Sequence, residues 1–320
     1  MKILVRLSLV DEFRHLVRDA AGDNTVVFAN SDEDSLHIEG VDAEVYCGNC
    51  SEAEFQHLPN VKWMQFGSAG MDAFLYPALR DSDVIVTNGA GLYGPEGAEH
   101  AFALLLSLTR GIHHCARNQT NPPADNPSIQ CGRVWGTEIN GWTLGVIGIG
   151  GFGLNMARIG KGFNMHVIAV DAYRTDKPDA VDVLTPLDGL SDLMRSADVV
   201  MTACPLTAET HHLINADNLA LMKPTAYVIN VTRGGVIDES ALIEALKARK
   251  IAGAGLDVVE IEPLAEDSPL RNMDNVVLSP HWAGISQQSP SRFAALFCEN
   301  LRRYLNGEPL KNVVDKQLGF

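Results

Sequence analysis

Residues 142–171 read WTLGVIGIGGFGLNMARIGKGFNMHVIAVD, and the spacing of their glycines predicts a nucleotide-binding fold. An apolar run leads into Gly148, Gly150 and Gly153, which fit the pattern G-x-G-x-x-G directly before a helical pattern. The first glycine permits a tight turn, the second lets backbone N–H groups approach a pyrophosphate, and the third allows close packing of helix on strand. The next apolar run ends at Asp171, 18 residues after Gly153, where an acid would bind the adenosine ribose hydroxyls. This arrangement favours dinucleotide binding over a glycine-rich turn beside a solvated acid.

Asp171 also bears on which dinucleotide binds. A carboxylate accepts hydrogen bonds from a ribose diol but repels a 2′-phosphate, so the sequence favours NAD over NADP. Arg174 lies only three residues later and could instead pair with such a phosphate. NADP therefore stays open as the less favoured cofactor.

Short apolar runs alternate with helical patterns along nearly the whole chain, which is typical of an α/β fold. Before the glycine motif the runs are KILVRL (2–7), TVVFA (25–29), VKWMQF (61–66) and DVIVTN (83–88). From Trp142 they are WTLGVIGIG (142–150), MHVIAVD (165–171), ADVVMTACP (197–205), AYVINVT (226–232), IAGAGLDVV (251–259) and NVVLSP (275–280). The two series predict two doubly wound, mostly parallel sheets of the Rossmann-like kind, and 320 residues are enough for two domains.

The overall charge argues against two classes of partner. The chain has a formal net charge of −15 and a pI near 5.0, and such a field repels phosphate backbones and anionic membranes. The opening apolar stretch is too short for a secretory signal, and no uninterrupted run of about 18 apolar residues occurs. We therefore expect no nucleic acid, no membrane and a cytoplasmic location.

Three side chains follow strand runs and could act together in catalysis: Arg233 in NVTRGGVID, Glu262 in LDVVEIEPL and His281 in SPHWAG. The loops beyond the carboxyl ends of parallel strands form the ligand crevice of such sheets. When hydride reaches a keto carbon, its oxygen needs a proton, which His281 could deliver while Glu262 orients and stabilises the imidazolium. Arg233 could bind a carboxylate bidentately and polarise the adjacent carbonyl. Taken singly, each has an ordinary alternative as a solvated or core-edge side chain.

Five segments of the chain together resemble the D-isomer-specific 2-hydroxyacid dehydrogenase family. They are the glycine motif with Asp171, CPLTAET (204–210), NVTRGGVIDESAL, GAGLDVVEIEPL and SPHWAG. The resemblance covers essentially the whole chain, with the motifs in family order. It implies a 2-keto acid reductase in which hydride passes between a nicotinamide and a small 2-keto or 2-hydroxy acid. The catalytic residues implied are Arg233, Glu262 and His281.

The resemblance also implies the binding residues. Those for the cofactor are Gly148, Gly150, Gly151, Phe152, Gly153, Asp171, Pro205, Thr210, Val231, Thr232, Arg233, Asp257 and His281. In the segment FGSAGMD, the backbone of Ser68, Ala69 and Gly70 would hold the substrate carboxylate together with Arg233 and His281. By itself that segment could equally be a simple turn.

The same resemblance implies a domain organisation. A discontinuous, flavodoxin-like substrate-binding domain would comprise residues 1–98 and 285–320, and an NAD-binding Rossmann domain would comprise residues 99–284. A homodimer is the usual assembly.

Other readings compete with this one. A non-enzymatic NAD(H)-sensing interaction protein could share the fold and even the catalytic group, and motifs alone do not exclude it. A hydrolase or amino-acid dehydrogenase on a similar sheet would not need an Arg, Glu and His in these loops. Formate dehydrogenases of the superfamily carry glutamine where this chain has Glu262.

Several residues receive structural rather than functional interpretations, and no metal site is expected. Cys47 and Cys50 form a C-x-x-C pair without the further ligands that zinc needs. The pairs His113-His114 and His211-His212 are adjacent, a spacing that does not present two ligands to one metal on a helix face. Tyr93 and Trp135 could shape a pocket, although aromatics in such loops more often pack. The Pro-rich stretch before Trp142 is long for a structureless loop and is expected to be functional or part of an interface.

Overall fold

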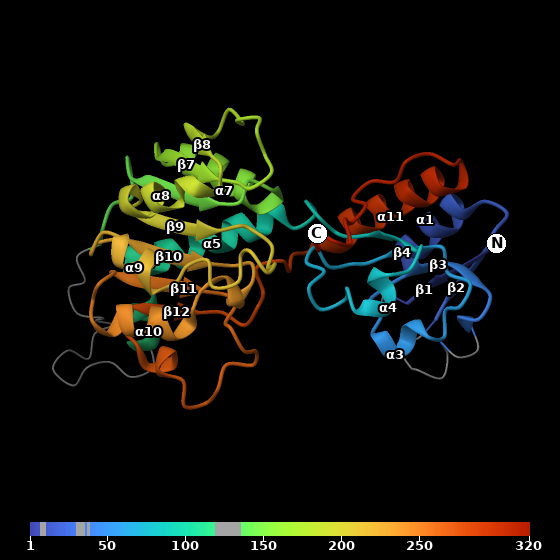
Figure 1. Cartoon of the computed structure of the whole chain (residues 1–320), viewed down its shortest axis with the longest axis horizontal. Coiled ribbons are helices and arrows are strands. Elements are labelled where there is room, and N and C mark those ends of the chain that lie inside the picture. Colours follow the sequence, from blue (N-terminus) through green and yellow to red (C-terminus); the bar gives the residue numbers. More distant parts are fainter. Residues whose placement is uncertain (7–10, 30–35, 37–38, 119–135) are drawn as a thin grey trace. The chain divides into compact units, whose positions relative to one another are not determined.

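The computed structural model describes residues 1–6, 11–29, 36, 39–118 and 136–320. The chain divides into two compact units (Figure 1). Unit 1 contains Met1–Tyr93 and Ser286–Phe320, and unit 2 contains Gly94–Ile285. Trp135 and most of the Pro-rich stretch lie outside the described residues. None of the described helices is long and apolar enough to cross a membrane.

Unit 1 is built on a five-stranded parallel sheet in the order β2-β1-β3-β4-β5. This is the flavodoxin-like order that the family resemblance implied. The strands are β1 (Lys2–Val5), β2 (Thr25–Phe28), β3 (Ala43–Cys47), β4 (Trp63–Gln65) and β5 (Ile85–Thr87). The helices are α1 (Asp11–Ala21), α3 (Glu52–Phe55), α4 (Pro77–Arg80) and α11 (Ser289–Leu305).

The carboxyl-terminal helix α11 packs beside α1 in unit 1, although more than 250 residues separate them in the sequence (Figure 1). Its apolar residues recur at helical spacing, and Phe297 is completely buried. The Trp63 ring of β4 lies 5.8 Å from the Phe297 ring and 5.2 Å from the Tyr304 ring. Buried Asn300 donates to Gln65 Oε1 at 3.1 Å, which satisfies two polar groups inside the core.

Unit 2 is built on a seven-stranded parallel sheet in the order β12-β11-β10-β9-β6-β7-β8. Its strands are β6 (Thr143–Ile147), β7 (His166–Val170), β8 (Val183–Thr185), β9 (Val199–Thr202), β10 (Tyr227–Asn230), β11 (Gly253–Leu256) and β12 (Val276–Leu278). Its α-helices are α5 (Gly94–Thr109), α6 (Ile112–Asn118), α7 (Gly151–Gly162), α8 (Leu190–Ser196), α9 (Ala216–Leu221) and α10 (Glu239–Lys247). Single 3-10 turns are η1 (Leu187–Gly189), η2 (Gly234–Val236) and η3 (Pro269–Asn272).

The strand order of unit 2 reverses between β6 and β9, and ligands of doubly wound sheets bind at such a switch point. Helix α5 approaches α7 so closely that a Cβ at Gly97 would lie 1.7 Å from the Phe152 ring. Only glycine fits at Gly97 unless the Phe152 ring moves. Phe152 is thereby held at the start of α7, next to the glycine motif.

Two strands were not anticipated from the sequence. β3 has the sequence AEVYC, and its position between β1 and β4 follows from pairing with both neighbours rather than from a long apolar run. β8 has the sequence VLT, and its residues are exposed or half-buried at the edge of the sheet. Short strands of this kind carry too few residues for a clear period.

Candidate active site

The glycine motif forms the turn from β6 into α7. Gly148 has a φ of +92°, and a Cβ there would lie 2.8 Å from the Cys204 backbone nitrogen. A Cβ at Gly153 would lie 2.0 Å from the Gly148 carbonyl oxygen, so the helix can approach the strand only without a side chain. A Cβ at Gly150 would meet nothing within 4 Å, and no side chain caps the helix there. The first N–H groups of α7 are therefore available to an anion beside open space.

Asp171 lies at the carboxyl end of β7, and three backbone N–H groups hold its carboxylate. Ile149 N donates to Oδ2 at 2.7 Å, while Tyr173 N and Arg174 N donate to Oδ1 at 2.9 and 2.8 Å. The Arg174 guanidinium donates to the Ile149 carbonyl oxygen at 3.0 Å and pairs with Asp176 at 2.8 Å. The acid and the arginine that bear on cofactor choice thus both contact the glycine turn.

The loops after β9 and β10 are fixed by their own side chains. Thr210 Oγ1 donates to the Pro205 carbonyl oxygen at 2.6 Å and accepts from Thr207 N at 2.8 Å. Buried Asn230 accepts from Thr202 Oγ1 at 2.7 Å and donates to the Arg233 carbonyl oxygen at 2.9 Å. Asn230 was not among the predicted site residues, although a buried amide at a strand end is a signal that could have indicated it.

Arg233 is half-buried, and the loop that carries it touches the loop after β11. Its Nη1 donates to the Thr232 carbonyl oxygen at 2.9 Å. A Cβ on the next residue, Gly234, would lie 1.8 Å from the Val259 carbonyl oxygen. The glycine therefore lets the Arg233 loop approach the segment that leads to Glu262.

Asp257 follows β11 and holds the turn that carries His281. Its carboxylate accepts from Ser279 Oγ at 2.6 Å, from Trp282 N at 2.9 Å and from Ala283 N at 2.8 Å, while its carbonyl oxygen accepts from His281 N at 2.8 Å. Burial tends to raise the pKa of Asp257, but hydrogen bonds from His100, Ser279 and the two backbone N–H groups lower it to about 2. Asp257 is thus a buried anion whose hydrogen bonds position the groups around it.

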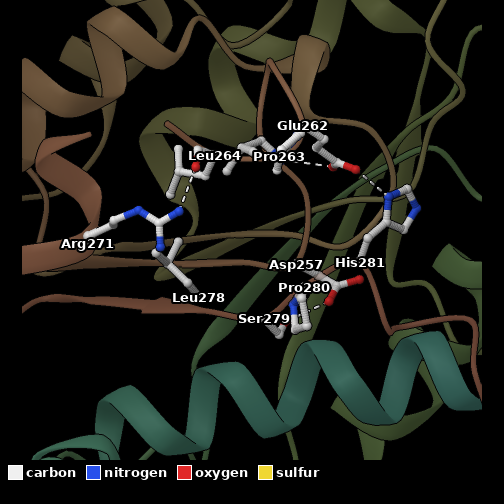
Figure 2. A pocket seen from close by; sticks show the side chains of 10 residues that line it. Asp257, Glu262, Pro263, Leu264, Arg271, Leu278, Ser279, Pro280 and His281 are labelled. Carbon is white, nitrogen blue, oxygen red and sulfur yellow. Dashed lines mark hydrogen bonds and ion pairs between the residues drawn. The ribbon is translucent and has the colours of Figure 1, made fainter. Parts of the chain in front are cut away.

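His281 and Glu262 contact each other directly. His281 Nδ1 lies 2.8 Å from Glu262 Oε2, and the side chains are 47% and 38% exposed, so a ligand can reach them. His281 has a φ of +59°, a left-handed conformation that the hydrogen bonds of Asp257 maintain. Figure 2 shows the imidazole and the carboxylate pointing toward each other at one end of a pocket of roughly 560 Å³. Apolar Pro263, Leu264 and Leu278 form much of its wall.

The predicted substrate loop lies in unit 1, after β4. Gly89 N donates to the Ser68 carbonyl oxygen at 2.8 Å, and Asn88 Nδ2 donates to the Ala69 carbonyl oxygen at 2.7 Å. The Tyr93 hydroxyl donates to the Gly67 carbonyl oxygen, so this aromatic residue positions the loop. Ser68 Oγ is buried and has no hydrogen-bond partner among the described residues. Such a hydroxyl is costly unless a ligand or water satisfies it.

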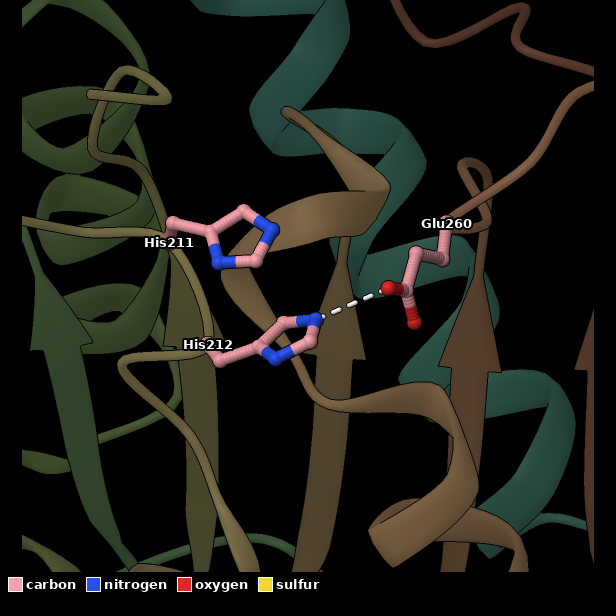
Figure 3. A group of neighbouring side chains, drawn as sticks. All are labelled: His211, His212 and Glu260. Carbon is pink, nitrogen blue, oxygen red and sulfur yellow. Dashed lines mark hydrogen bonds and ion pairs between the residues drawn. The ribbon is translucent and has the colours of Figure 1, made fainter. Parts of the chain in front are cut away.

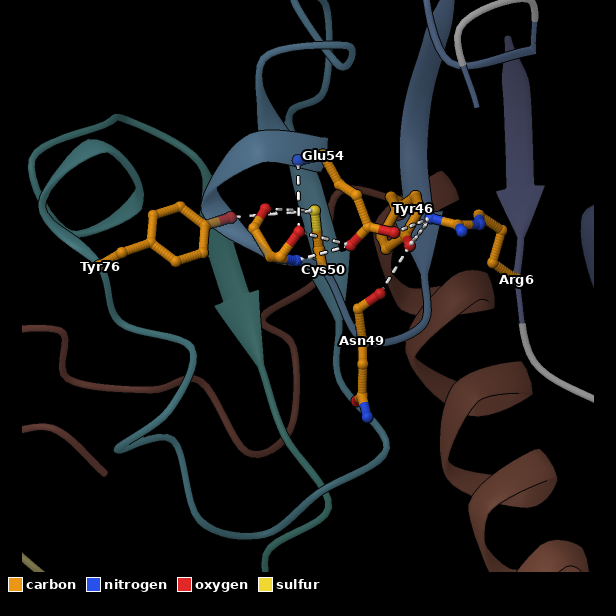
Figure 4. Close-up of polar contacts among 7 residues, drawn as sticks. Arg6, Tyr46, Asn49, Cys50, Glu54 and Tyr76 are labelled. Carbon is orange, nitrogen blue, oxygen red and sulfur yellow. Dashed lines mark hydrogen bonds and ion pairs between the residues drawn. The ribbon is translucent and has the colours of Figure 1, made fainter. Parts of the chain in front are cut away.

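Cys47 and Cys50 lie on different sides of the unit 1 sheet, since they belong to separate hydrophobic clusters. Burial raises the pKa of both thiols, well above the usual value for Cys47 and to about 12 for Cys50. The Tyr76 hydroxyl donates to Cys50 Sγ at 3.8 Å, and nearby Arg6 pairs with Glu54 at 2.8 Å (Figure 4). Protonated thiols that face different clusters do not form a shared ligand site.

Comparisons with known proteins show the family of the chain. The family profile described as "D-isomer specific 2-hydroxyacid dehydrogenase, NAD binding domain" matches residues 102–283. A glyoxylate reductase of Korarchaeum cryptofilum is 34% identical over 290 residues, which cover 89% of this chain and 82% of that protein. A D-3-phosphoglycerate dehydrogenase of Archaeoglobus fulgidus is 34% identical over 86% of this chain, but the match spans only 49% of that protein.

A similar solved structure is a D-isomer specific 2-hydroxyacid dehydrogenase from Xanthobacter autotrophicus Py2 in complex with NADPH and MES. It is 30% identical with a TM-score of 0.81, and the match covers 99% of each chain. The two-domain architecture of this chain is therefore also that of a solved relative.

Proposed function

Because this chain belongs to the D-isomer-specific 2-hydroxyacid dehydrogenase family and is an NAD(P)-dependent oxidoreductase of 2-hydroxy acids, we propose that it reduces a small 2-keto acid with NADH through Arg233, Glu262 and His281. Bound NADH would supply the hydride. The residues of the chain would bind the acid, orient its carbonyl and deliver the proton. The alternative of a non-enzymatic NAD(H)-sensing protein receives no support from the comparisons.

The 2.8 Å contact between His281 Nδ1 and Glu262 Oε2 carries this proposal. Because Glu262 engages Nδ1, Nε2 is the nitrogen that faces a substrate and donates the proton to the carbonyl oxygen. The carboxylate fixes the ring orientation and stabilises the imidazolium, as an anionic neighbour does for a general acid. In the reverse direction, the neutral imidazole accepts the proton of the hydroxyl group.

Arg233 and the Ser68–Gly70 loop would both bind the carboxylate of the substrate acid. The planar guanidinium of Arg233 can bind the substrate carboxylate and polarise the keto oxygen next to it. The backbone N–H groups of Ser68, Ala69 and Gly70 would bind the same carboxylate, and the unpartnered Ser68 hydroxyl could donate to it. We accordingly assign substrate binding to residues 1–98 and 285–320 and cofactor binding to residues 99–284.

The proposed cofactor residues form two groups: those that would shape the site of the pyrophosphate, and those that would line the rest of the cofactor. Gly148, Gly150, Gly151, Phe152 and Gly153 would shape the pyrophosphate site, with the free N–H groups of α7 as its donors. Pro205, Thr210, Val231, Thr232 and Asp257 would line the path from the nucleotide to the nicotinamide. The open space beside Gly150 supports the fit of a phosphate there.

We propose NADH rather than NADPH as the preferred cofactor. The Asp171 carboxylate can accept from ribose hydroxyls and would repel a 2′-phosphate, and Arg174 is already paired with Asp176. The NADPH bound to the Xanthobacter relative makes this a question for measurement. We expect Asp171→Ala to reduce the ratio of kcat/KM with NADH to kcat/KM with NADPH by about ten-fold or more. A variant that keeps the wild-type ratio would show that another group discriminates the cofactors.

The assembly and location are further proposals. The family resemblance supports a homodimer, and the cytoplasm is proposed because no uninterrupted run of about 18 apolar residues occurs in the sequence. Light scattering of the purified protein measures the mass directly, and a monomer at micromolar concentration would contradict the dimer.

The proposed reaction can be tested by the near-ultraviolet absorbance of NADH and, separately, of NADPH with a panel of 2-keto acids from glyoxylate to phenylpyruvate. We expect rapid NADH oxidation with at least one acid and a 2-hydroxy acid of D configuration as product. Tight NADH binding without oxidation by any acid in the panel would overturn the proposal and favour the sensor.

A further inference from the structure

His211, His212 and Glu260 form a cluster in unit 2 that the proposed reaction does not use. Their ligand atoms all lie within 4.8 Å of one another, and the described parts of the chain contain no other group of three such residues. His211 and Glu260 are exposed and His212 is half-buried, so an ion can enter from solvent. We propose that these three side chains bind a late first-row divalent cation of the Zn²⁺ type.

The backbone explains how adjacent histidines serve one ion. The segment forms a turn and not a helix, with Thr210 N and His211 N both donating to the Thr207 carbonyl oxygen. His212 has a φ of +51°, a left-handed conformation that is uncommon for a residue other than glycine. The two imidazoles consequently lie on the same side of the turn (Figure 3). Their ring centroids are 3.9 Å apart. Adjacent histidines in this turn can therefore face one ion, although adjacent histidines on a helix cannot.

The distances suit direct coordination. His212 Nε2 lies 2.8 Å from Glu260 Oε1. Zn–N and Zn–O bonds of about 2.0–2.2 Å place two ligands of one tetrahedral ion roughly 3.4 Å apart, so His212 Nε2 and Glu260 Oε1 would need to separate only slightly. The His211 ring, which is stacked on that of His212, would turn to direct a ring nitrogen at the ion. Two imidazoles and a carboxylate are ligands that Zn²⁺ prefers, and water can take the remaining position.

The carboxylate of Glu260 is also oriented by a second set of contacts. Glu239 N donates to its Oε2 at 3.3 Å, and Glu260 N donates to Glu239 Oε2 at 3.1 Å. Hydrogen bonds of this kind orient ligands around metal ions and increase affinity. Oε1 remains directed at His212 (Figure 3).

The other adjacent pair, His113-His114, provides a contrast within the same chain. Its rings are also close, with centroids 3.8 Å apart. However, both ring nitrogens of His113 lie within hydrogen-bond distance of carbonyl oxygens, those of Ser107 at 2.8 Å and Asp274 at 2.9 Å. A nitrogen that donates a proton to a carbonyl has no lone pair for a metal. The His212 nitrogen that faces Glu260 meets a carboxylate instead, which can share an ion with it.

An ion at this cluster would join two loops near the proposed catalytic group. His211 and His212 follow Thr210 in the loop after β9, and Glu260 precedes Glu262 in the loop after β11. Because the ion binds the folded chain and not the dispersed ligands, occupancy should raise the unfolding temperature, by about 5–10 °C at a hundred times the dissociation constant. This effect does not depend on turnover.

The test is calorimetric titration of the untagged full chain with ZnCl₂ after chelator treatment, with a Zn²⁺-dependent melting temperature as second readout. The informative variants are Glu260→Gln, which keeps an acceptor oxygen for His212, and His212→Asn, which tolerates the left-handed backbone. His211→Ala removes the third ligand. We expect one Zn²⁺ per wild-type chain and roughly a 10-fold or greater loss of affinity in each variant.

His114→Ala is the matched control and should bind Zn²⁺ like the wild type. Circular dichroism and NADH binding report whether each variant is folded. Absence of 1:1 binding by the wild type would overturn the site. Wild-type affinity in both Glu260→Gln and His212→Asn would overturn it as well, because the ion would then be bound elsewhere.

Discussion

At the scale of single residues, the contact between Glu262 and His281 Nδ1 leaves Nε2 as the imidazole nitrogen that the proposed substrate would meet. We expect His281→Asn, which tolerates the left-handed backbone, to lower kcat by about two to four orders of magnitude while the NADH dissociation constant changes little. Steady-state kinetics and NADH fluorescence titration measure the two quantities separately. Unchanged turnover with lost NADH binding would assign His281 to the cofactor and not to proton transfer.

Glu262→Gln tests the charge of the same pair while preserving its shape. The amide still accepts from His281 Nδ1 but carries no charge to stabilise the imidazolium that donates the proton. We therefore expect kcat/KM for reduction to fall by roughly ten-fold or more while the NADH dissociation constant changes little. Wild-type kcat/KM in the variant would remove Glu262 from this role.

At the scale of elements, Asp257 joins the end of β11 to the turn after β12. Asp257→Asn keeps most of the shape but loses the charge that four neighbouring donors stabilise. Because a hydrogen bond to a charged group contributes about 1.5–3 kcal/mol, we expect the melting temperature at pH 7 to fall by several degrees. His281 would also be held less firmly, so kcat should decline.

The pH dependence of this variant has a definite sign. The pKa of Asp257 is lowered from 3.8 to about 2 in the folded chain, so its charge stabilises the fold above the unfolded pKa, and this contribution is lost as pH falls through the folded pKa. The difference in melting temperature between wild type and Asp257→Asn should therefore be largest near neutral pH and shrink between about pH 4 and pH 2. A difference that is constant from pH 7 to pH 2 would show that the Asp257 charge is not what stabilises this junction.

The strands and turns also explain which parts of the fold and of the site could be predicted from the sequence. Runs such as TLGVI and YVIN were recognisable because a strand covered on both faces is apolar throughout. β3 and β8 were not predicted from the sequence, because pairing with neighbouring strands and not a local apolar pattern makes these segments strands. The glycine turn was predictable because its spacing is local. The unpartnered Ser68 hydroxyl, the Asn230 contacts and the left-handed turn at His212 depend on tertiary packing, which no local pattern encodes.

At the scale of the whole molecule, unit 2 is one continuous segment, Gly94–Ile285, inserted into unit 1. All seven strands of its sheet lie within that segment, as do the two hydrophobic clusters on either side of it. Unit 1, in contrast, needs both ends of the chain, because α11 completes the core around Trp63. The two units should therefore differ in whether they can fold alone.

We expect a fragment of residues 94–285 to unfold cooperatively and to bind NADH, because its core and its proposed cofactor residues are all present. It should not reduce any 2-keto acid at a rate near that of the full chain, because the Ser68–Gly70 loop is missing. A fragment of residues 1–93 should fail to fold, since Trp63 and Phe293 of the same cluster are then separated. Thermal unfolding followed by circular dichroism and NADH fluorescence tests these expectations. An unfolded 94–285 fragment would mean that unit 1 contributes to the stability of unit 2, and full activity of that fragment would remove the substrate loop from the proposed site.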